Sequence, residues 1–101
     1  MKKILLCCSA GMSTSILVQR MQAEVTKRAL NIEIKAASTI ELKHLITDAD
    51  IVLLGPQVRH QLAHFSAIAK PLGKPIDIID MMDYGALRGD KVLDKALSLL
   101  E

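Results

Sequence analysis

The chain has 101 residues, 50% of them hydrophobic but only 2% aromatic, and its formal net charge is +2. This length suits a single domain over residues 1–101, whose core must be built mainly from aliphatic side chains. The small, scattered positive charge and the scarcity of aromatic residues argue against a nucleic-acid-binding surface, and no apolar run is long enough to span a membrane.

The first half of the chain predicts two strands separated by a helix. Residues 3–8 form an apolar run, typical of a buried strand, that ends at Cys8. A helix is predicted from residue 13 or 14 to about residue 28. Its core face consists of Leu17, Val18, Met21 and Val25. Residues 32–36 alternate apolar residues with charged or small ones, which indicates a strand at the edge of a sheet.

The second half continues the alternation of helices and strands. Its predicted elements, in order, are a short helix over 40–47, a strand over 50–54, a helix over about 58–69, a strand over 76–79, a turn at 84–85 and a last helix capped by Asp90. The strand over 50–54 is apolar on both faces after Asp50, as in the centre of a parallel sheet, and Gly55 and Pro56 end it.

This pattern predicts a flavodoxin-like α/β fold with helices on both faces of a four-stranded parallel sheet. Right-handed crossovers and a central first strand give the strand order 2-1-3-4. Ligands bind such sheets beyond the carboxyl ends of the strands. Those ends are Cys8, the turn at residues 55–57 and the region 80–85, which makes Gln57 and Tyr84 candidates for the periphery of a site.

The loop that follows Cys8 predicts an anion-binding site with a nucleophile. A cysteine between a strand and a helix start lies beside backbone N–H groups and the positive end of the helix dipole, which stabilise a thiolate and bind phosphate. Gly11 allows the backbone to curl around an anion. The candidate phosphate-binding residues are Ser9, Ala10, Gly11, Met12, Ser13, Thr14 and Ser15. Neither a metal nor a cofactor is needed for this chemistry, and the hydroxyls at 13, 14 and 15 could equally be helix caps.

The two cysteines have different predicted roles. Cys7 and Cys8 are adjacent, so a disulfide between them would be strained. Cys7 should point to the opposite face of its strand and pack in the core.

His60 and His64 are one helical turn apart, but Gln61 replaces the glutamate of a zinc motif, so we expect an exposed helix face.

Two other classes of protein share parts of this loop. Cysteine phosphatases of low molecular weight, and arsenate reductases like them, require an arginine six residues after the cysteine, where this chain has Thr14. They also use an aspartate followed by proline, whereas Tyr84 follows Asp83. A module that binds a phosphate-bearing ligand such as a flavin nucleotide usually has stacking aromatic residues, and only Phe65 and Tyr84 are available.

Three segments together resemble the IIB component of the bacterial phosphoenolpyruvate-dependent sugar phosphotransferase system. They are residues 8–15, residues 50–57, and residues 78–80 leading to Tyr84 and Gly85. The match is to the lactose/cellobiose (diacetylchitobiose) family, and it extends in order over essentially the whole chain.

The resemblance implies a phosphoryl carrier that works through a phosphocysteine at Cys8. A IIA partner would deliver the group from a phosphohistidine, and a membrane IIC partner would present the sugar that receives it. The sugar class would be a β-linked disaccharide such as cellobiose, chitobiose or lactose. The apolar run after Lys2 and Lys3 is too short for a signal peptide. We therefore expect a cytoplasmic protein that meets the membrane only through IIC.

Overall fold

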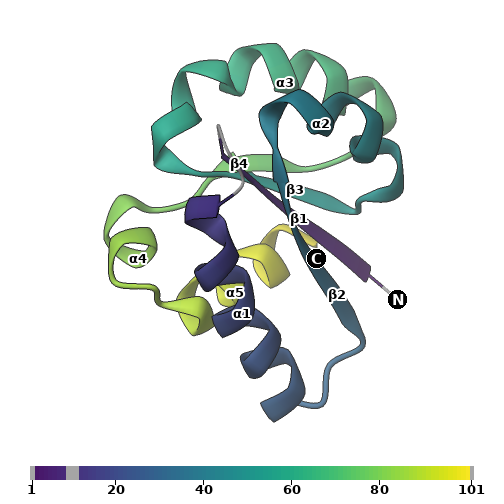
Figure 1. Cartoon of the computed structure of the whole chain (residues 1–101). Helices are drawn as coiled ribbons and strands as arrows, with labels where there is room; N and C mark the ends of the chain where they lie inside the picture. The colour runs from purple at the N-terminus through teal and green to yellow at the C-terminus, as the bar shows by residue number, and fades with distance from the viewer. Residues whose placement is uncertain (1, 9–11, 101) are drawn as a thin grey trace.

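Four parallel strands form one sheet in the order β2-β1-β3-β4, as predicted (Figure 1). The structure, a computed structural model, describes residues 2–8 and 12–100, except the side chains at positions 12 and 13. The strands are β1 (Lys2–Cys8), β2 (Ile32–Ser38), β3 (Ile51–Leu54) and β4 (Ile76–Ile78). The central β1 therefore carries Cys8 to the middle of the carboxyl edge, and β2 is an edge strand as its alternating pattern predicted.

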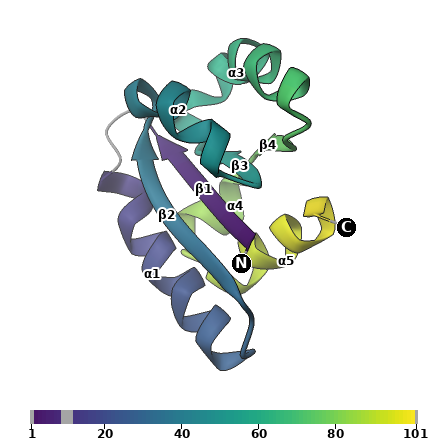
Figure 2. The same ribbon diagram turned by 90° about the vertical axis from the view of Figure 1, so that its right-hand side faces the viewer.

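Helices cover both faces of the sheet. The α-helices are α1 (Met12–Lys27), α2 (Thr39–Leu45), α3 (Leu62–Ala69), α4 (Met81–Gly85) and α5 (Gly89–Leu100). Short 3-10 helices are η1 (Ile46–Asp48), η2 (Pro56–Gln61) and η3 (Lys70–Leu72). Helices α1 and α5 lie on one face, and α2 and α3 lie on the other (Figures 1 and 2).

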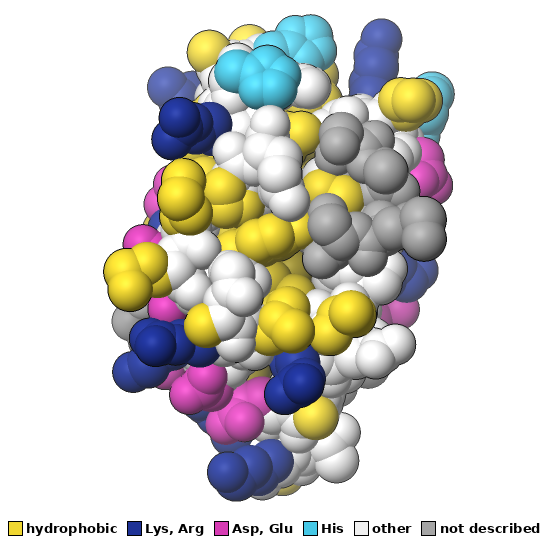
Figure 3. Space-filling model, turned by 60° about the vertical axis from the view of Figure 1, so that its left-hand side comes forward, with side chains coloured by type: hydrophobic (Ala, Val, Ile, Leu, Met, Phe, Trp, Pro, Cys, Tyr) yellow, Lys and Arg dark blue, Asp and Glu magenta, His cyan; other side chains and the backbone are white. Residues whose placement is uncertain are grey.

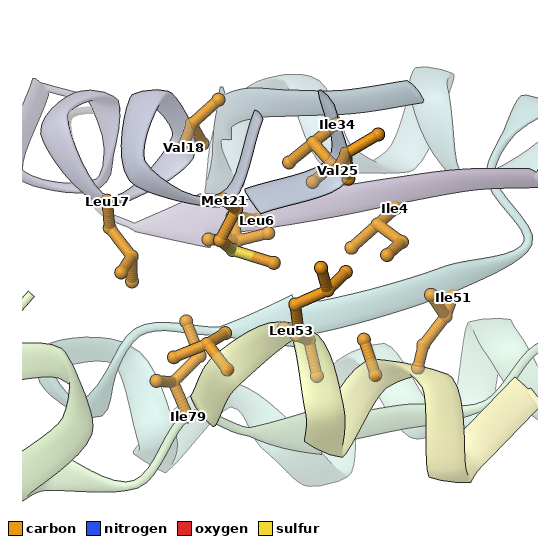
Figure 4. Close-up of a cluster of buried hydrophobic side chains, with 13 residues drawn as sticks. Ile4, Leu6, Leu17, Val18, Met21, Val25, Ile34, Ile51, Leu53 and Ile79 are labelled. Atoms are coloured by element: carbon orange, nitrogen blue, oxygen red, sulfur yellow. The ribbon is translucent and has the colours of Figure 1, made fainter. Parts of the chain in front are cut away.

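The side chains of β1 alternate between two hydrophobic cores. Ile4 and Leu6 pack with α1 and α5, together with the residues labelled in Figure 4. Leu5 and Cys7 pack on the other face, in a cluster that includes side chains from α2 and α3. The predicted core residues of α1 are all buried: Leu17, Val18, Met21 and Val25. Alternation along β1 therefore separates the two cysteines, and Cys7 is a core residue as predicted.

Backbone hydrogen bonds align the carboxyl ends of the three strands nearest the site. Cys8 is in register with Ser38 of β2. The Gly55 N–H donates to the Cys7 carbonyl at 2.7 Å, and the Ile79 N–H donates to the Leu54 carbonyl at 2.8 Å. The segments after β1, β3 and β4 therefore start at one edge of the sheet, where ligands bind in folds of this type.

The helix predicted over residues 58–69 is wrong in its first part. The segment begins as the 3-10 helix η2, and α3 starts only at Leu62. Val58 leaves helical dihedral angles (φ −115°, ψ 19°), which interrupts the α-helical hydrogen-bond series. The apolar periodicity of the segment predicts one face of Val58, Leu62, Phe65 and Ala69. Leu62 is partly buried, and the other three lie in the core.

The turn predicted at residues 84–85 is instead the last part of α4. The Asp80 carboxylate caps this helix by accepting hydrogen bonds from the N–H groups of Met82 (3.0 Å) and Asp83 (3.1 Å). The reversal comes after α4, where Leu87 has a φ of 54°. Helix α5 then begins at Gly89, so Asp90 lies in its first turn and is not its cap.

Candidate functional site

Cys8 is the last residue of β1 and lies at the centre of the carboxyl edge of the sheet. It is 1% exposed and belongs to neither of the two hydrophobic clusters that pack on the sheet. Helix α1 begins at Met12, four positions along the chain. Cys8 therefore has the position, between a strand end and a helix start, that the sequence predicted.

Thr14, in the first turn of α1, lies against Cys8. Its Oγ1 is 3.7 Å from Cys8 Sγ, and either atom could donate the hydrogen bond. The Thr14 side chain is completely buried. Since Thr14 holds the sixth position after the cysteine, the place of the phosphatase arginine is taken by a neutral hydroxyl in contact with the thiol.

The N-terminal turn of α1 favours an anion beside Cys8. The contact between Thr14 and Cys8 brings this turn to the end of β1. No acidic side chain lies in the turn. Backbone N–H groups at a helix N-terminus lack partners within the helix, and the helix dipole is positive there. The turn can therefore hold a phosphoryl group without a metal ion or a basic side chain.

The remaining loop candidates are placed only in part. Ser15 belongs to the first turn of α1, and its side chain is exposed. Ser9, Ala10 and Gly11 lie outside the described residues. For two further candidates, Met12 and Ser13, the structure gives the helical backbone only. Among these candidates, the structure thus places the Thr14 side chain against the thiol.

Cys7 is unsuited to nucleophilic chemistry. Burial raises the pKa of its thiol from the ordinary value of 9.0 to about 12, and the charges of Cys8 and Glu41 add to the increase. The thiolate is the nucleophilic form of cysteine. Cys7 therefore stays protonated near neutral pH.

Gln57 and Tyr84, predicted at the periphery of the site, contact each other across its far side. Gln57 Nε2 donates a hydrogen bond of 2.9 Å to Tyr84 Oη. Gln57 comes from η2, directly after β3, and Tyr84 from α4, directly after β4. A phenol that accepts this bond still carries its own hydrogen to donate. The pair joins two segments that are 27 positions apart in the chain.

Gly55 connects this pair to Cys8. A Cβ added to Gly55 would lie 2.6 Å from Gln57 Oε1, 3.4 Å from the Cys7 carbonyl oxygen and 3.6 Å from Cys8 Cβ. The absence of a side chain at Gly55 therefore lets Gln57 fold back over the strand end, close to the cysteine.

A groove opens on the outer side of the Gln57–Tyr84 pair, between η2 and α4. Its volume is about 500 Å³. It is lined by Pro56, Gln57, Arg59, His60, Met81, Tyr84 and Gly85, and we call it the η2–α4 groove. Our sequence interpretation missed Arg59 and Met81. Arg59 lies in η2, which follows β3, and Met81 begins α4, which follows β4. Both could have been found by considering every residue of the segments that follow these strands.

Large apolar side chains are exposed on several elements that begin at the carboxyl edge of the sheet. They are Ile16 of α1, Ile40 of α2, and Met81 and Met82 of α4, and the most exposed is Ile40 at 83%. Hydrophobic side chains form a band across the face shown in Figure 3, with histidine and basic side chains toward its upper edge. Patches of this kind commonly mark protein–protein contacts.

The histidines do not form a metal site. His60 and His64 are both exposed, as expected, and they lie in different helices, η2 and α3. Among residues 2–8 and 12–100, no three His, Cys, Asp or Glu side chains are grouped so as to hold a metal ion. Within the same residues, no helix is both long and apolar enough to cross a membrane.

Comparison with known sequences identifies one family. Residues 3–95 match the family described as "PTS system, Lactose/Cellobiose specific IIB subunit". The chain is 41% identical to the galactose-specific EIIB component of Lactococcus lactis subsp. cremoris (strain MG1363), over 98% of this chain and 96% of that protein. It is 40% identical to the oligo-beta-mannoside-specific EIIB component of Bacillus subtilis (strain 168), over 99% and 97% of the two chains.

Solved structures share the fold. The cellobiose-specific IIB component of Borrelia burgdorferi superposes with a TM-score of 0.82 at 41% identity, covering 98% of this chain and 91% of that one. The lactose-specific IIB domain of Streptococcus pneumoniae gives a TM-score of 0.90 at 20% identity, covering 99% and 98%. The second likeness shows that the fold persists where most of the sequence differs.

Proposed function

Because the chain belongs to the lactose/cellobiose-specific IIB family of the sugar phosphotransferase system, we propose that it carries phosphoryl groups on Cys8. It is a transferase component for sugars of the cellobiose and lactose type. The observation that carries the proposal is the 3.7 Å contact between Cys8 Sγ and Thr14 Oγ1. That contact puts a neutral donor, in place of an arginine, beside the only cysteine at the strand end.

The first step transfers the group from a phosphohistidine of a IIA partner. The Cys8 thiolate attacks phosphorus, the S–P bond forms, and the P–N bond breaks with its electron pair going to the imidazole nitrogen. In the second step a hydroxyl of the sugar held by membrane IIC attacks the same phosphorus. The S–P bond breaks, Cys8 leaves as thiolate, and a base on the partner takes the hydroxyl proton.

Neutral groups would hold the phosphoryl oxygens in both steps. The donors are the backbone N–H groups of the loop and of the first turn of α1, residues 9–15, together with the hydroxyl of Thr14, 3.7 Å from sulfur. A fixed arginine would bind the phosphoryl group bidentately and favour hydrolysis. A carrier needs to accept and release the group with little change in free energy, which neutral donors favour.

Gln57 and Tyr84 would form the wall of the site opposite α1. Gly55 leaves Gln57 close to Cys8 Cβ, and Tyr84 fixes the Gln57 amide through the 2.9 Å hydrogen bond. In this role the pair restricts the access of water to the phosphocysteine and orients the incoming partner.

The protein would act in the cytoplasm and associate with the membrane only by docking on IIC.

Reconstitution of the relay tests this function. The purified protein is mixed with phosphoenolpyruvate, the general phosphotransferase proteins, a lactose/cellobiose-type IIA and membranes that contain the matching IIC. We expect phosphorylation of cellobiose or a related sugar that depends on this chain, that persists in Cys7→Ser and that is lost in Cys8→Ser. Steady release of phosphate from p-nitrophenyl phosphate, without any transfer from IIA, would instead favour the phosphatase alternative.

A further inference from the structure

The η2–α4 groove carries positive charge beside the proposed phosphoryl site. Arg59 and His60 of η2 line it on one side, and Met81 and Tyr84 of α4 line it on the other. None of the described side chains that line it is acidic. The groove therefore combines one permanent cation and one imidazole with an apolar surface.

The carboxylates closest in sequence to the groove are engaged elsewhere. The Asp80 carboxylate accepts hydrogen bonds from the N–H groups of Met82 and Asp83 at the start of α4. Asp83 Oδ1 lies 3.8 Å from Arg88 Nη1. Both carboxylates keep their charge but lie outside the lining of the groove, in which Arg59 is the permanently charged side chain among the described residues.

Gln57 and Tyr84 connect the groove to the strand end that carries Cys8. Gln57 lines the groove and also lies beside Gly55, whose Cβ position is 3.6 Å from Cys8 Cβ. Tyr84 also lines the groove, and its hydroxyl oxygen accepts a hydrogen bond from the Gln57 amide. A protein seated in the groove would thus touch the pair that borders the thiol.

We propose that the η2–α4 groove is the docking surface for an acidic face of the phosphohistidine-bearing IIA partner. The inference rests on the proposed function and adds the surface and the charge of the partner. Positive potential attracts the donor more strongly than the acceptor, because the donor brings a negatively charged phosphoryl group and the sugar is neutral. Once that group has moved to Cys8, the discharged donor is held less strongly and can leave.

The apolar part of the groove would supply contact area. Met81 is 62% exposed, and Met82 beside it is 72% exposed. Unbranched methionine side chains adapt their shape to a partner surface. A rim of cations around such a contact mainly sets the rate and the salt dependence of association.

Charge reversal at Arg59 tests the proposal. The rate of Cys8 phosphorylation is measured by intact mass against IIA concentration, for wild type, Arg59→Glu and Arg59→Lys, at low and high salt. We expect Arg59→Glu to lower the second-order rate constant about tenfold at low salt and to approach wild type at high salt. Arg59→Lys should keep most of the wild-type rate.

Matched controls isolate the surface. Lys70→Glu makes the same change in net charge at the first residue of η3, after the end of α3, and should behave as wild type. The rate of Cys8 alkylation by iodoacetamide should be the same in all variants, which shows that the nucleophile is intact. Met81→Ala should raise the concentration of IIA at half-maximal rate with little effect on the maximal rate.

The outcomes separate this inference from the proposed function. If the wild type accepts no phosphoryl group from any IIA, the proposed function fails. If the wild type is phosphorylated and Arg59→Glu matches it at every salt concentration, the docking proposal is overturned. It is equally overturned if Arg59→Glu slows only transfer from phosphorylated protein to sugar on IIC membranes, since that result would assign the groove to the acceptor.

Discussion

Thr14 Oγ1 lies 3.7 Å from Cys8 Sγ, across a loop that separates the two residues by six positions. The contact joins the end of β1 to the first turn of α1, and it buries the threonine completely. A hydroxyl in this place can donate to a thiolate, and it can turn toward a phosphoryl oxygen once sulfur is esterified. In the proposed function, it links the nucleophile to the turn that would hold the phosphoryl group.

Removing this hydroxyl should weaken the nucleophile. Thr14→Val keeps the shape of the side chain but loses the donor, so the thiolate of Cys8 is less stabilised. We expect phosphorylation by IIA to slow about tenfold or more. The pH dependence of Cys8 alkylation should shift to higher pH.

Thr14→Ser provides the matched control. It keeps the hydroxyl and removes only a methyl group, so most of the transfer rate should remain. A wild-type rate and an unchanged alkylation profile in Thr14→Val would show that the threonine only fills space at the helix start.

The Gln57–Tyr84 pair should act as a unit that depends on Gly55. A Cβ on Gly55 would lie 2.6 Å from Gln57 Oε1, so Gly55→Ala must displace the amide, which is the mobile end of its side chain. We expect Gly55→Ala, Gln57→Ala and Tyr84→Phe each to lower the transfer rate about threefold to tenfold. The folded state should persist by circular dichroism.

A double-mutant cycle checks the coupling between Gly55 and Gln57. Combining Gly55→Ala with Gln57→Ala should cost little more than either change alone, because both remove the same contact. Gly85→Ala adds a methyl group that meets nothing within 4 Å, but Gly85 lines the η2–α4 groove, so this variant is a control for folding and not for transfer. Additive losses in the double variant would contradict the linkage.

Cys7 should make the protein less stable at alkaline pH. Its pKa is about 12 in the folded protein against an ordinary value of 9.0, so the unfolded chain binds fewer protons above pH 9. The stabilisation is complete below pH 9 and is lost as pH rises toward 12, by about 1.4 kcal/mol per pH unit at most.

Urea unfolding at several pH values from 7 to 11 measures this effect. The comparison is between wild type and Cys7→Ala, because the other titrating groups contribute equally to both. We expect a shallower alkaline loss of unfolding free energy in Cys7→Ala. Equal slopes for the two proteins would show that Cys7 ionises as easily when folded as when unfolded.

Close packing of α5 on α1 should make Gly89 intolerant of a side chain. A Cβ there would lie 2.7 Å from the carbonyl carbon of Arg20 and 2.8 Å from the N of Met21, both backbone atoms that cannot move independently. We expect Gly89→Ala to lower the free energy of unfolding by about 1–3 kcal/mol in urea titrations. The same titration of Gly85→Ala should show a much smaller change.

Most of the sheet was predictable, because its signals are local. Apolar runs gave the four strands, and strand-end reasoning brought Gln57 and Tyr84 to one side of Cys8. Alternation along β1 correctly separated Cys7 from Cys8. These predictions depended only on a period of two residues and on parallel pairing.

The departures arose where tertiary contacts determine the backbone. Nothing in the periodicity of residues 58–69 showed that Val58 would leave helical angles. Helix α4 was missed because its N-cap, Asp80, directly follows the predicted strand and was interpreted as part of the strand end. The direct contact of Thr14 with Cys8 could not be predicted from the sequence, because it depends on how the chain folds between them. From the spacing alone, the Thr14 hydroxyl could have been either a helix cap or a phosphate ligand.

The central claim is that the phosphoryl group resides on Cys8, and peptide mass spectrometry tests it most directly. The protein is phosphorylated by IIA in the presence of phosphoenolpyruvate, digested under conditions that preserve thiophosphate esters, and fragmented to locate the group. We predict one phosphoryl group on Cys8 in wild type and in Cys7→Ser, and none in Cys8→Ser. A phosphoryl group on a histidine or on Cys7, or undiminished labelling of Cys8→Ser, would contradict the account.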